Sequence, residues 1–343
     1  MARSKPINLA LQGGGAHGAF TWGVLDRLLE EPDIDIAAMS GTSAGALNGA
    51  AVKAGLIDGR TAARDNLEWL WEQVGAITDD RFAPWLNAVS PVAMSATLET
   101  SLPFALSDSV SRVVSPYASG PFYQNPLDRI VRRFRYDHVC GAQGPDLFIC
   151  ATNVRSGKIR VFSGDDITPE AIMASACLPT LFRAVELHDP ETGTLEAYWD
   201  GGYTGNPALF PLFHPKLPRD ILVVNINPLH RDALPTTARA IQNRINEISF
   251  NSSLLRELRA IEFVQRLLSD GTVPEHSMKH VLIHMIADDA LMQQLSVATK
   301  LFATPQILHQ LRAAGRMATE AFLRDDIDRI GVESTVDLRH MFG

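Results

Sequence analysis

The sequence contains few cysteines, and their placement excludes two kinds of site. Cys140, Cys150 and Cys177 are the three cysteines among 343 residues. Their odd number and wide spacing suit neither a structural metal site nor a framework of disulfides. We therefore expect free thiols in a reducing compartment.

Long hydrophobic runs are also lacking. No apolar run reaches the roughly 18 residues that a membrane-spanning helix needs. The first six residues, Met-Ala-Arg-Ser-Lys-Pro, lead into a short apolar run that soon meets three glycines. This order indicates a first strand and not a signal peptide. We expect a soluble cytoplasmic protein, and peripheral contact with a membrane surface stays open.

An excess of positive charge is missing too. The net charge is -8 at pH 7, which argues against nucleic acid as the main partner. The chain does have 46% hydrophobic residues, enough to bury a large core. Strand and helix patterns alternate along the whole sequence without an internal repeat or linker. We expect one α/β domain over residues 1–343, with a helical C-terminal extension over about 235–343.

Apolar periodicity and turn residues predict the secondary structure. Strands are predicted at 7–12, 34–39, 146–152, 158–163, 183–187, 195–199, 220–227 and 279–286. Helices are predicted at 19–29, 44–56, 59–74, 168–176, 237–268 and 304–323, and a further helix starts at Asn125-Pro126. Helix 237–268 carries Ile241, Ile245 and Ile248 at a spacing that is typical of an amphipathic helix.

A glycine-rich loop joins the first strand to the first helix. Residues 13–18 read Gly-Gly-Gly-Ala-His-Gly, so several backbone N–H groups converge where an anion can bind. A phosphate-binding P-loop would end in Gly-Lys-Ser/Thr, but this loop ends in His17-Gly18. A dinucleotide fold would place an acid at the end of the second strand, whereas Asp33 and Asp35 lie at its beginning. The loop therefore favours the oxyanion of an acyl-transfer reaction over nucleotide binding.

A second turn between a strand and a helix carries Ser43. Residues 41–45 read Gly-Thr-Ser-Ala-Gly, the Gly-x-Ser-x-Gly pattern in which a serine hydroxyl stands at an exposed apex. The glycines let the backbone turn sharply, and the following helix N-terminus favours negative charge on the serine oxygen. The alternative is an ordinary turn whose serine caps the helix.

After the glycine loop and Ser43, the third candidate part of a site is Asp200. It lies at the end of a predicted strand and is followed by two glycines. This arrangement places a carboxylate beside backbone that other groups can approach closely, although a simple Asp-Gly turn is the alternative. The candidate ligands for a metal site are His276, His280 and His284. Their spacing by four suits a helix, but the surrounding residues predict a strand, so no metal is expected.

An unusual segment lies between the predicted helix 59–74 and the helix that starts at Asn125-Pro126. Residues 83–111 include two charged residues, Glu99 and Asp108, and are apolar and interrupted by prolines. Such a segment is too long for a typical connection. We expect an insertion over about 76–124 that is either an irregular cap packed on the core or a lid over an apolar substrate.

Together, the glycine loop 13–18, the pentapeptide 41–45 and Asp-Gly-Gly at 200–202 resemble the patatin-like phospholipase family. The stretch Ala-Ser-Ala-Cys-Leu-Pro at 174–179 also resembles that family's Ala-Ser-x-x-x-Pro segment. The resemblance covers residue 7 to about residue 210. It implies a three-layer α/β/α fold around a mostly parallel sheet, and lipid acyl hydrolysis by a Ser–Asp dyad without cofactor or metal.

The resemblance also implies roles for individual residues. Ser43 would be the nucleophile and Asp200 its base. The oxyanion hole would be formed by the backbone of the loop, at Gly13, Gly14, Gly15 and Ala16, with the N–H of Ala44 as an added donor. Many members of the family have Arg or Lys where this chain has His17, which leaves the head group and the pH optimum open.

Other functions remain open at the level of the sequence. A Ser-His-Asp esterase, thioesterase or polyester depolymerase could use His214, His230 or His284, which all follow Asp200 in the chain. A lipid- or granule-binding regulatory protein with little turnover is an alternative of another class. The expected partner is a lipid or another acyl ester; the sequence does not indicate its head group, its acyl length or the oligomeric state.

Overall fold

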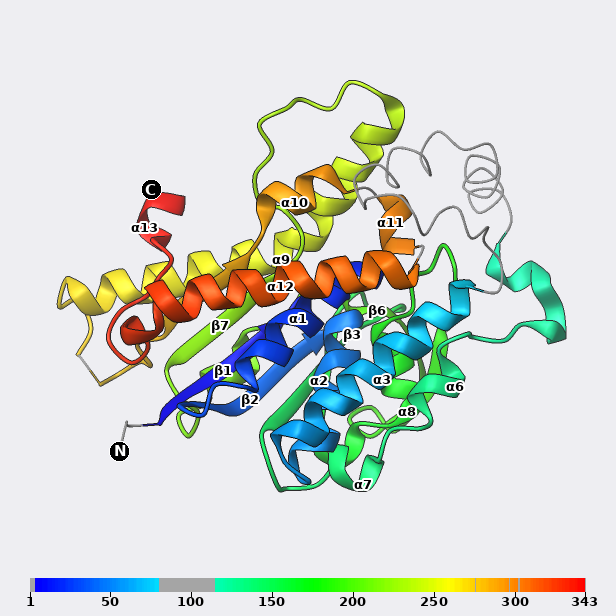
Figure 1. The fold of residues 1–343 in the computed structure, drawn as a ribbon, viewed down its shortest axis with the longest axis horizontal. Helices are drawn as coiled ribbons and strands as arrows, with labels where there is room; N and C mark the ends of the chain where they lie inside the picture. The colour runs from blue at the N-terminus through cyan, green and yellow to red at the C-terminus, as the bar shows by residue number, and fades with distance from the viewer. Residues whose placement is uncertain (1–3, 80–114, 275, 296, 302, 343) are drawn as a thin grey trace.

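A computed structural model describes residues 4–79, 115–274, 276–295, 297–301 and 303–342 (Figure 1). Residues 80–114 of the predicted insertion, which include segment 83–111, lie outside the described residues. The chain resumes at the short helical segment η3 (Pro116–Phe122).

Among the described residues, eight strands form a sheet at the centre of the molecule. Seven strands follow the order β5 (Val185–Asp189), β6 (Thr194–Asp200), β3 (Asp146–Asn153), β2 (Ile34–Thr42), β1 (Lys5–Leu11), β7 (Asp220–Asn225) and β8 (Leu282–Ala287). The eighth, β4 (Ile159–Ser163), pairs antiparallel with β3. Neighbours from β3 to β8 are parallel, whereas β5 and β6 run antiparallel to their partners. The mostly parallel sheet predicted from the sequence is confirmed.

Alternation of side chains along the strands creates two apolar faces. On β1, Leu9 and Leu11 belong to one buried cluster, whereas Ala10 belongs to the other. On β7, Leu222 joins the first cluster and Val223 the second. Because successive side chains of a strand point to opposite faces, a run of apolar residues fills both layers. Each fully buried Leu or Val stabilises the fold by roughly 1.5–3 kcal/mol.

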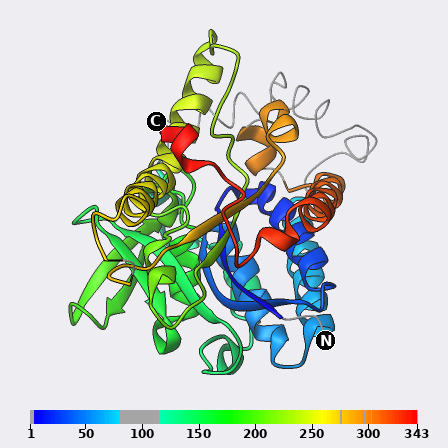
Figure 2. The same cartoon turned by 90° about the vertical axis from the view of Figure 1, so that its left-hand side faces the viewer.

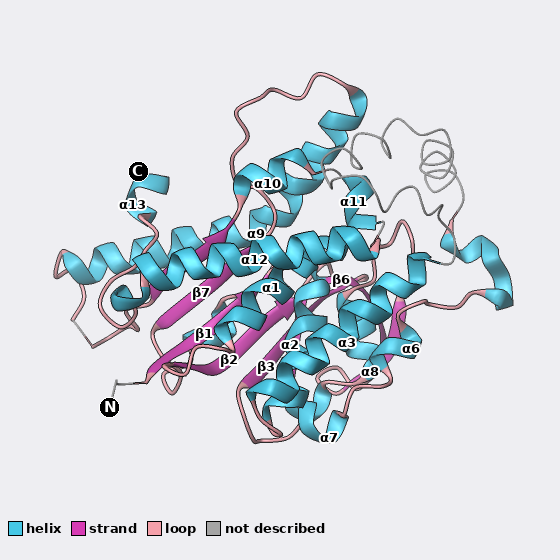
Figure 3. Ribbon diagram, in the orientation of Figure 1, coloured by secondary structure: helices cyan, strands magenta, loops and turns pink. Residues whose placement is uncertain are grey.

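Helices cover both faces of the sheet (Figures 2 and 3). The first cluster includes side chains from α1 (Gly18–Leu28), α2 (Ala44–Leu56), α3 (Arg60–Asp79), α8 (Pro169–Ser175) and α12 (Pro305–Asp325). The second includes side chains from α9 (Ala238–Ser269). The three-layer arrangement is therefore as predicted.

The sequence analysis did not predict four short helices. They are α7 (Tyr136–Val139), α10 (Asp289–Gln294), α11 (Val297–Leu301) and α13 (Leu338–Phe342). The helix predicted from Asn125-Pro126 is only α6 (Asp128–Val131).

Helix α9 differs from the amphipathic pattern expected for it. Thr237 caps its N-terminus, but Ile241, Ile245 and Ile248 are 43%, 52% and 54% exposed. Further along the helix, Leu258 is fully buried. The N-terminal half extends beyond the strands in Figures 1 and 2, so only the C-terminal half has a sheet to cover.

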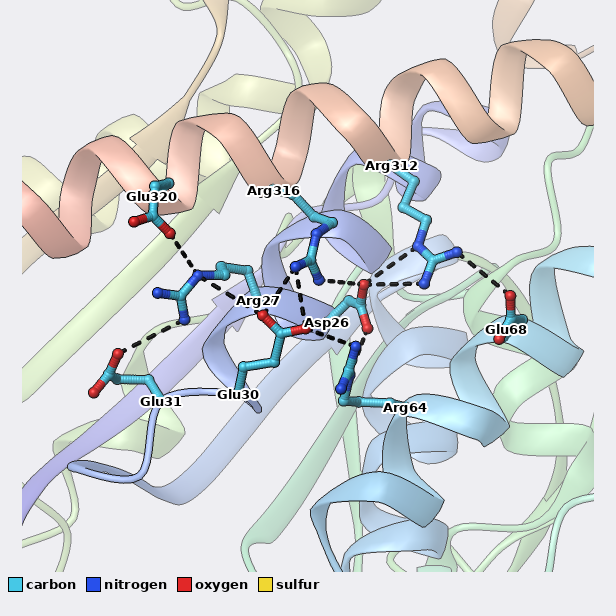
Figure 4. A network of polar contacts seen from close by, with 9 residues as sticks. All are labelled: Asp26, Arg27, Glu30, Glu31, Arg64, Glu68, Arg312, Arg316 and Glu320. Carbon is cyan, nitrogen blue, oxygen red and sulfur yellow. Dashed lines mark hydrogen bonds and ion pairs between the residues drawn. The ribbon is translucent and has the colours of Figure 1, made fainter.

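Helix α12, near the C-terminus, packs against helix α1, near the N-terminus. A Cβ at Gly315 would lie 2.1 Å from the Phe20 carbonyl oxygen, and one at Gly23 would lie 2.0 Å from that of Arg312. The two glycines therefore allow the helix backbones to approach closely. Beside this crossing, Asp26 accepts hydrogen bonds from arginines of two other helices, as Figure 4 shows.

Candidate active site

Strand register explains why Ser43 and Asp200 meet. On β3, Cys150 pairs with Thr42 at the end of β2, and the next residue, Ala151, pairs with Asp200 at the end of β6. Ala151 also pairs with β4, so β6 must lie along the same edge of β3 as β2. The ends of β2 and β6 therefore face each other at consecutive positions of one strand.

Ser43 has the backbone strain of a sharp turn between a strand and a helix. Its φ of 53° makes it the one non-glycine residue with positive φ in the described ranges. A Cβ at Gly45 would lie 2.1 Å from the Leu11 carbonyl oxygen, and one at Gly41 would lie 2.5 Å from that of Gly45. Only glycine fits these positions, so the pentapeptide forms the predicted turn at Ser43. Strain of this kind concentrates at functional sites.

The backbone of Ser43 is held by a second serine. The Ser43 N–H donates to Ser175 Oγ at 2.9 Å, and that hydroxyl donates to the Cys150 carbonyl at 2.6 Å. Ser175 is fully buried at the end of α8, a helix capped by Thr168. Ser175 belongs to the stretch 174–179, which resembles the family's Ala-Ser-x-x-x-Pro segment. This stretch thus holds the turn at Ser43 against β3.

Asp200 is almost completely buried and is oriented by its neighbours. Its carboxylate accepts the Gly202 N–H at 2.7 Å, and its own N–H donates to the Cys177 carbonyl at 2.8 Å. Burial raises the pKa of Asp200 to about 7, although hydrogen bonds from the Gly202 N–H and the Ser43 hydroxyl oppose that rise. The Ser43 hydroxyl and the Asp200 carboxylate therefore interact directly, and the carboxylate ionises near neutral pH.

The glycine loop lies against the same turn. A Cβ at Gly13 would be 2.7 Å from Ser43 Cβ. The Gly13 N–H donates to Asn206 Oδ1 at 2.7 Å, so this one group of the expected oxyanion hole already has an acceptor. The N–H groups of Gly14, Gly15 and Ala16 have no acceptor within the described part of the chain. These three remain available for an anion.

Buried amides that the sequence analysis missed support the loop. Gln12 Oε1 accepts the backbone N–H groups of Ile226 and Asn227 at 2.9 and 3.1 Å. Asn227 Nδ2 donates to the Gly13 carbonyl at 2.9 Å, and Asn251 Nδ2 donates to the Pro228 carbonyl at 3.0 Å. These residues connect the loop to β7 and α9. For Gln12 and Asn227 the only signal in the sequence is a polar residue at the end of an apolar run, and Asn251 lies inside a helix without such a signal.

His17 lies inside the protein and not at a solvent-exposed edge. It is 1% exposed, and its Nε2 lies 2.8 Å from Thr299 Oγ1. Burial, reinforced by the nearby Lys300, holds the pKa of His17 well below its usual value. The imidazole is therefore neutral at neutral pH and brings no positive charge to the loop.

The three histidines considered for a Ser-His-Asp site have other surroundings. His284 lies in β8 with its Nε2 2.9 Å from Asp220 Oδ1, and His230 Nδ1 lies 3.5 Å from Asp232 Oδ1. His214 is exposed and accepts the Lys216 N–H. Within the residues that the structure covers, none is hydrogen-bonded to Ser43 or Asp200. Those residues also contain no group of three or more His, Cys, Asp or Glu arranged to hold a metal.

A comparison with models of protein families shows which family the chain belongs to. The family model for patatin-like phospholipase matches residues 9–213. The chain belongs to the patatin-like phospholipase family. The resemblance seen in the three motifs is therefore confirmed, and with it membership of a family of carboxylic ester hydrolases.

Two solved structures are similar to this patatin-like protein at low sequence identity. VipD from Legionella pneumophila is 13% identical, with a TM-score of 0.35, over 91% of this chain and 67% of VipD. ExoU from Pseudomonas aeruginosa, solved with SpcU, is 17% identical, with a TM-score of 0.31, over 94% of this chain. The chain spans only 54% of the length of ExoU.

A comparison with curated proteins gave no match. No helix among the described residues combines the length and the apolar character that crossing a bilayer requires.

Proposed function

We propose that this patatin-like protein hydrolyses lipid acyl esters, with Ser43 as nucleophile and Asp200 as its general base. The observation that supports this most is the pairing of a strained serine with a buried carboxylate whose pKa is about 7. A carboxylate of ordinary pKa is a weak base for an alcohol, and the raised value brings Asp200 into the useful range. Family membership supports a lipid as the acyl donor.

The reaction would proceed in two steps. Ionised Asp200 removes the proton from Ser43 Oγ as that oxygen attacks the ester carbonyl carbon. The tetrahedral intermediate collapses, the alcohol leaves with the proton from Asp200, and an acyl-enzyme remains. Asp200 then removes a proton from water, which attacks the acyl carbon, and the fatty acid is released with Ser43 reprotonated.

Backbone donors would stabilise the negative charge that develops on the carbonyl oxygen. The N–H groups of Gly14, Gly15 and Ala16 are the proposed donors, because no acceptor in the described residues occupies them. Each well-placed donor of this type contributes about 3 kcal/mol to lowering the barrier. The N–H of Ala44, at the start of α2, stays an added candidate.

Hydrolysis of a short and a long p-nitrophenyl ester tests the proposed pair. Wild type, Ser43→Ala and Asp200→Asn are compared, with His214→Ala and His230→Ala as controls. We expect kcat to fall about 10³-fold or more in both dyad variants, as when a nucleophile or its base is lost. Both controls should keep the activity of the wild type.

Three results would count against the proposal. High activity in Asp200→Asn would remove Asp200 as the base, and loss of activity in a histidine variant would favour a Ser-His-Asp enzyme. The third result would come from an assay with phospholipid vesicles as a second substrate. Vesicle binding by a wild type that releases no fatty acid would favour the binding-only alternative.

A further inference from the structure

Lys300 lies against the glycine loop although it is far from it in the sequence. Its helix, α11, packs on the short helix η1 (Gly15–His17). Gly15 has a φ of 59°, and a Cβ there would lie 2.4 Å from the Lys300 carbonyl oxygen. Backbone contact at this position therefore fixes where the lysine side chain begins.

The ammonium group of Lys300 is connected to the loop through one amide. Lys300 Nζ donates to Asn227 Oδ1 at 2.8 Å, and Asn227 Nδ2 donates to the Gly13 carbonyl at 2.9 Å. A Cβ at Gly14 would lie 3.9 Å from the same Asn227 oxygen. The Asn227 side chain thus links the Lys300 ammonium group to the loop, whose N–H groups at Gly14, Gly15 and Ala16 have no acceptor in the described residues.

The charges around Lys300 leave this region positive. Glu247 on α9 acts to raise the pKa of Lys300, but its carboxylate pairs with Arg231 at 2.6 Å and with Arg244 at 3.2 Å. His17 on η1 is neutral because its pKa is lowered. Three cations therefore surround one carboxylate, and the positive charge of Lys300 is not cancelled locally.

We propose that Lys300 is a positioning residue that places a positive charge behind the oxyanion loop and acts through Asn227. The inference rests on the proposed acyl-transfer function. A cation there stabilises negative charge on an oxygen held by Gly14, Gly15 and Ala16. Asn227, polarised by the ammonium, holds the Gly13 carbonyl and so aims the peptide N–H groups that follow it. Lys300 lies beyond residues 9–213, the segment that matches the family model.

The acid–base behaviour of the site gives this proposal a readable signature. Asp200 must be ionised, so kcat rises as the pH passes through about 7. Burial lowers the pKa of Lys300 to about 8, so its positive charge is lost as the pH rises further. We expect the wild-type profile of kcat against pH to rise near 7 and to fall near 8.

Lys300→Met and Lys300→Arg test the role of the charge. In Lys300→Met we expect kcat at pH 7.5 to fall about tenfold to hundredfold with KM nearly unchanged, and the decrease near pH 8 to disappear. The loss should be smaller than the 10²–10³ that follows removal of a direct oxyanion donor. Lys300→Arg should restore most of kcat and keep it above pH 8, because arginine does not deprotonate in this range.

Lys279→Met is the matched control. Lys279 Nζ also donates to neutral carbonyls, those of Leu212 and His214 at 3.0 Å, and burial also lowers its pKa. It precedes β8 and lies near the end of the sheet opposite to Ser43. This variant should change neither kcat nor the shape of the profile, whatever it does to stability.

Ser43→Ala separates failure of this inference from failure of the proposed function. If Ser43→Ala is inactive while Lys300→Met keeps the wild-type kcat and profile, Lys300 has no such role. If Ser43→Ala remains active, the proposed function and the role of Lys300 both fall. Should Lys300→Met lack a folded circular dichroism spectrum, Lys300→Arg decides alone, and a decrease that stays near pH 8 would overturn the inference.

Discussion

Asp200 is a single residue whose burial has opposite effects on stability and on the proposed chemistry. Its pKa rises from 3.8 to about 7 on folding. Between these two pH values the folded state binds the Asp200 proton more tightly than the unfolded state does. The free energy of unfolding therefore decreases as the pH rises from 3.8 through about 7. At pH 8 that loss amounts to about 4 kcal/mol, at about 1.4 kcal/mol per pKa unit.

Asp200→Asn should therefore stabilise the protein at pH 8 while it abolishes activity. We expect the urea midpoint to exceed that of wild type at pH 8 and the difference to vanish near pH 4. Asp189→Asn is the matched control, because hydrogen bonds from Tyr198 and Arg160 outweigh burial and lower the pKa of this buried carboxyl. That variant should be destabilised at pH 8, and a gain of stability there would refute the electrostatic reasoning.

Ser175 offers a second prediction at the scale of one residue. Ser175→Ala removes the acceptor of the Ser43 N–H and the donor to the Cys150 carbonyl. We expect a loss of about 1–3 kcal/mol in unfolding free energy, the cost of buried polar groups left without partners. Because the turn at Ser43 loosens, kcat on a p-nitrophenyl ester should fall about tenfold.

Ser40→Ala is the control for Ser175→Ala. Ser40 is equally buried and donates to the Ala208 carbonyl at 2.6 Å, a bond that does not involve Ser43. It should lose similar stability and keep its kcat. Equal kcat values for the two variants would contradict a specific role for Ser175.

The residues of the site differ in how far the sequence predicts them. Ser43 and Asp200 are marked by adjacent glycines, and the clashes that a Cβ would meet explain why those glycines are needed. Ser175 and Asn227 carry no such mark. They bond to groups 132 and 214 residues away in the chain, so their roles depend on tertiary contacts that local patterns do not contain.

At the scale of elements, the network around Asp26 joins three helices. Asp26 on α1 accepts from Arg64 on α3 at 2.7 Å, and from Arg312 and Arg316 on α12 at 3.0 and 2.5 Å (Figure 4). The Asp26 side chain is 1% exposed, so its charge holds together arginines that would otherwise repel one another. Glu30 also pairs with Arg64 and Arg316.

Asp26→Ala should be strongly destabilising. We expect a loss of about 3–5 kcal/mol in urea unfolding, as when one partner of a buried ion pair is removed. Glu68→Ala is the control, because Glu68 is half exposed and its pair with Arg312 spans 3.4 Å. Its loss should stay below about 1 kcal/mol. Similar losses for both variants would show that the buried carboxylate has no special role.

Sequence patterns predicted most elements because each long helix or strand carries its own periodicity. Two exceptions have physical reasons. Strand β2 continues through Thr42, where Ser-Gly-Thr suggests a turn, because pairing with β1 and β3 overrides the local preference. Helix α11, with five residues, is too short for a periodic pattern, so the lysine it carries could not be connected to the loop.

At the scale of the whole molecule, the segment that matches the family model lacks part of the sheet. It ends at residue 213, before β7, which lies between β1 and β8. A chain of residues 1–213 would also lack α9 and α12 and expose apolar surface on both faces. We expect this fragment to lack cooperative urea unfolding and ester hydrolysis.

A chain ending at residue 337 is the control for that truncation. It loses α13, in which Leu338 is buried, at a cost of about 2 kcal/mol. It should still unfold cooperatively and hydrolyse esters. Cooperative unfolding of the 1–213 fragment, followed by circular dichroism, would contradict the view that both ends of the chain build one core.

The position of β7 also has a consequence for biosynthesis. Chains emerge from the ribosome N-terminus first, so Ser43 and Asp200 are both made before β7 and Asn227. A nascent chain that already contains both side chains still lacks the strand that pairs with β1 and the amide that holds the Gly13 carbonyl. Any hydrolytic activity should therefore arise only after β7 and Asn227 have been translated, so unfinished copies that lack them should be inactive.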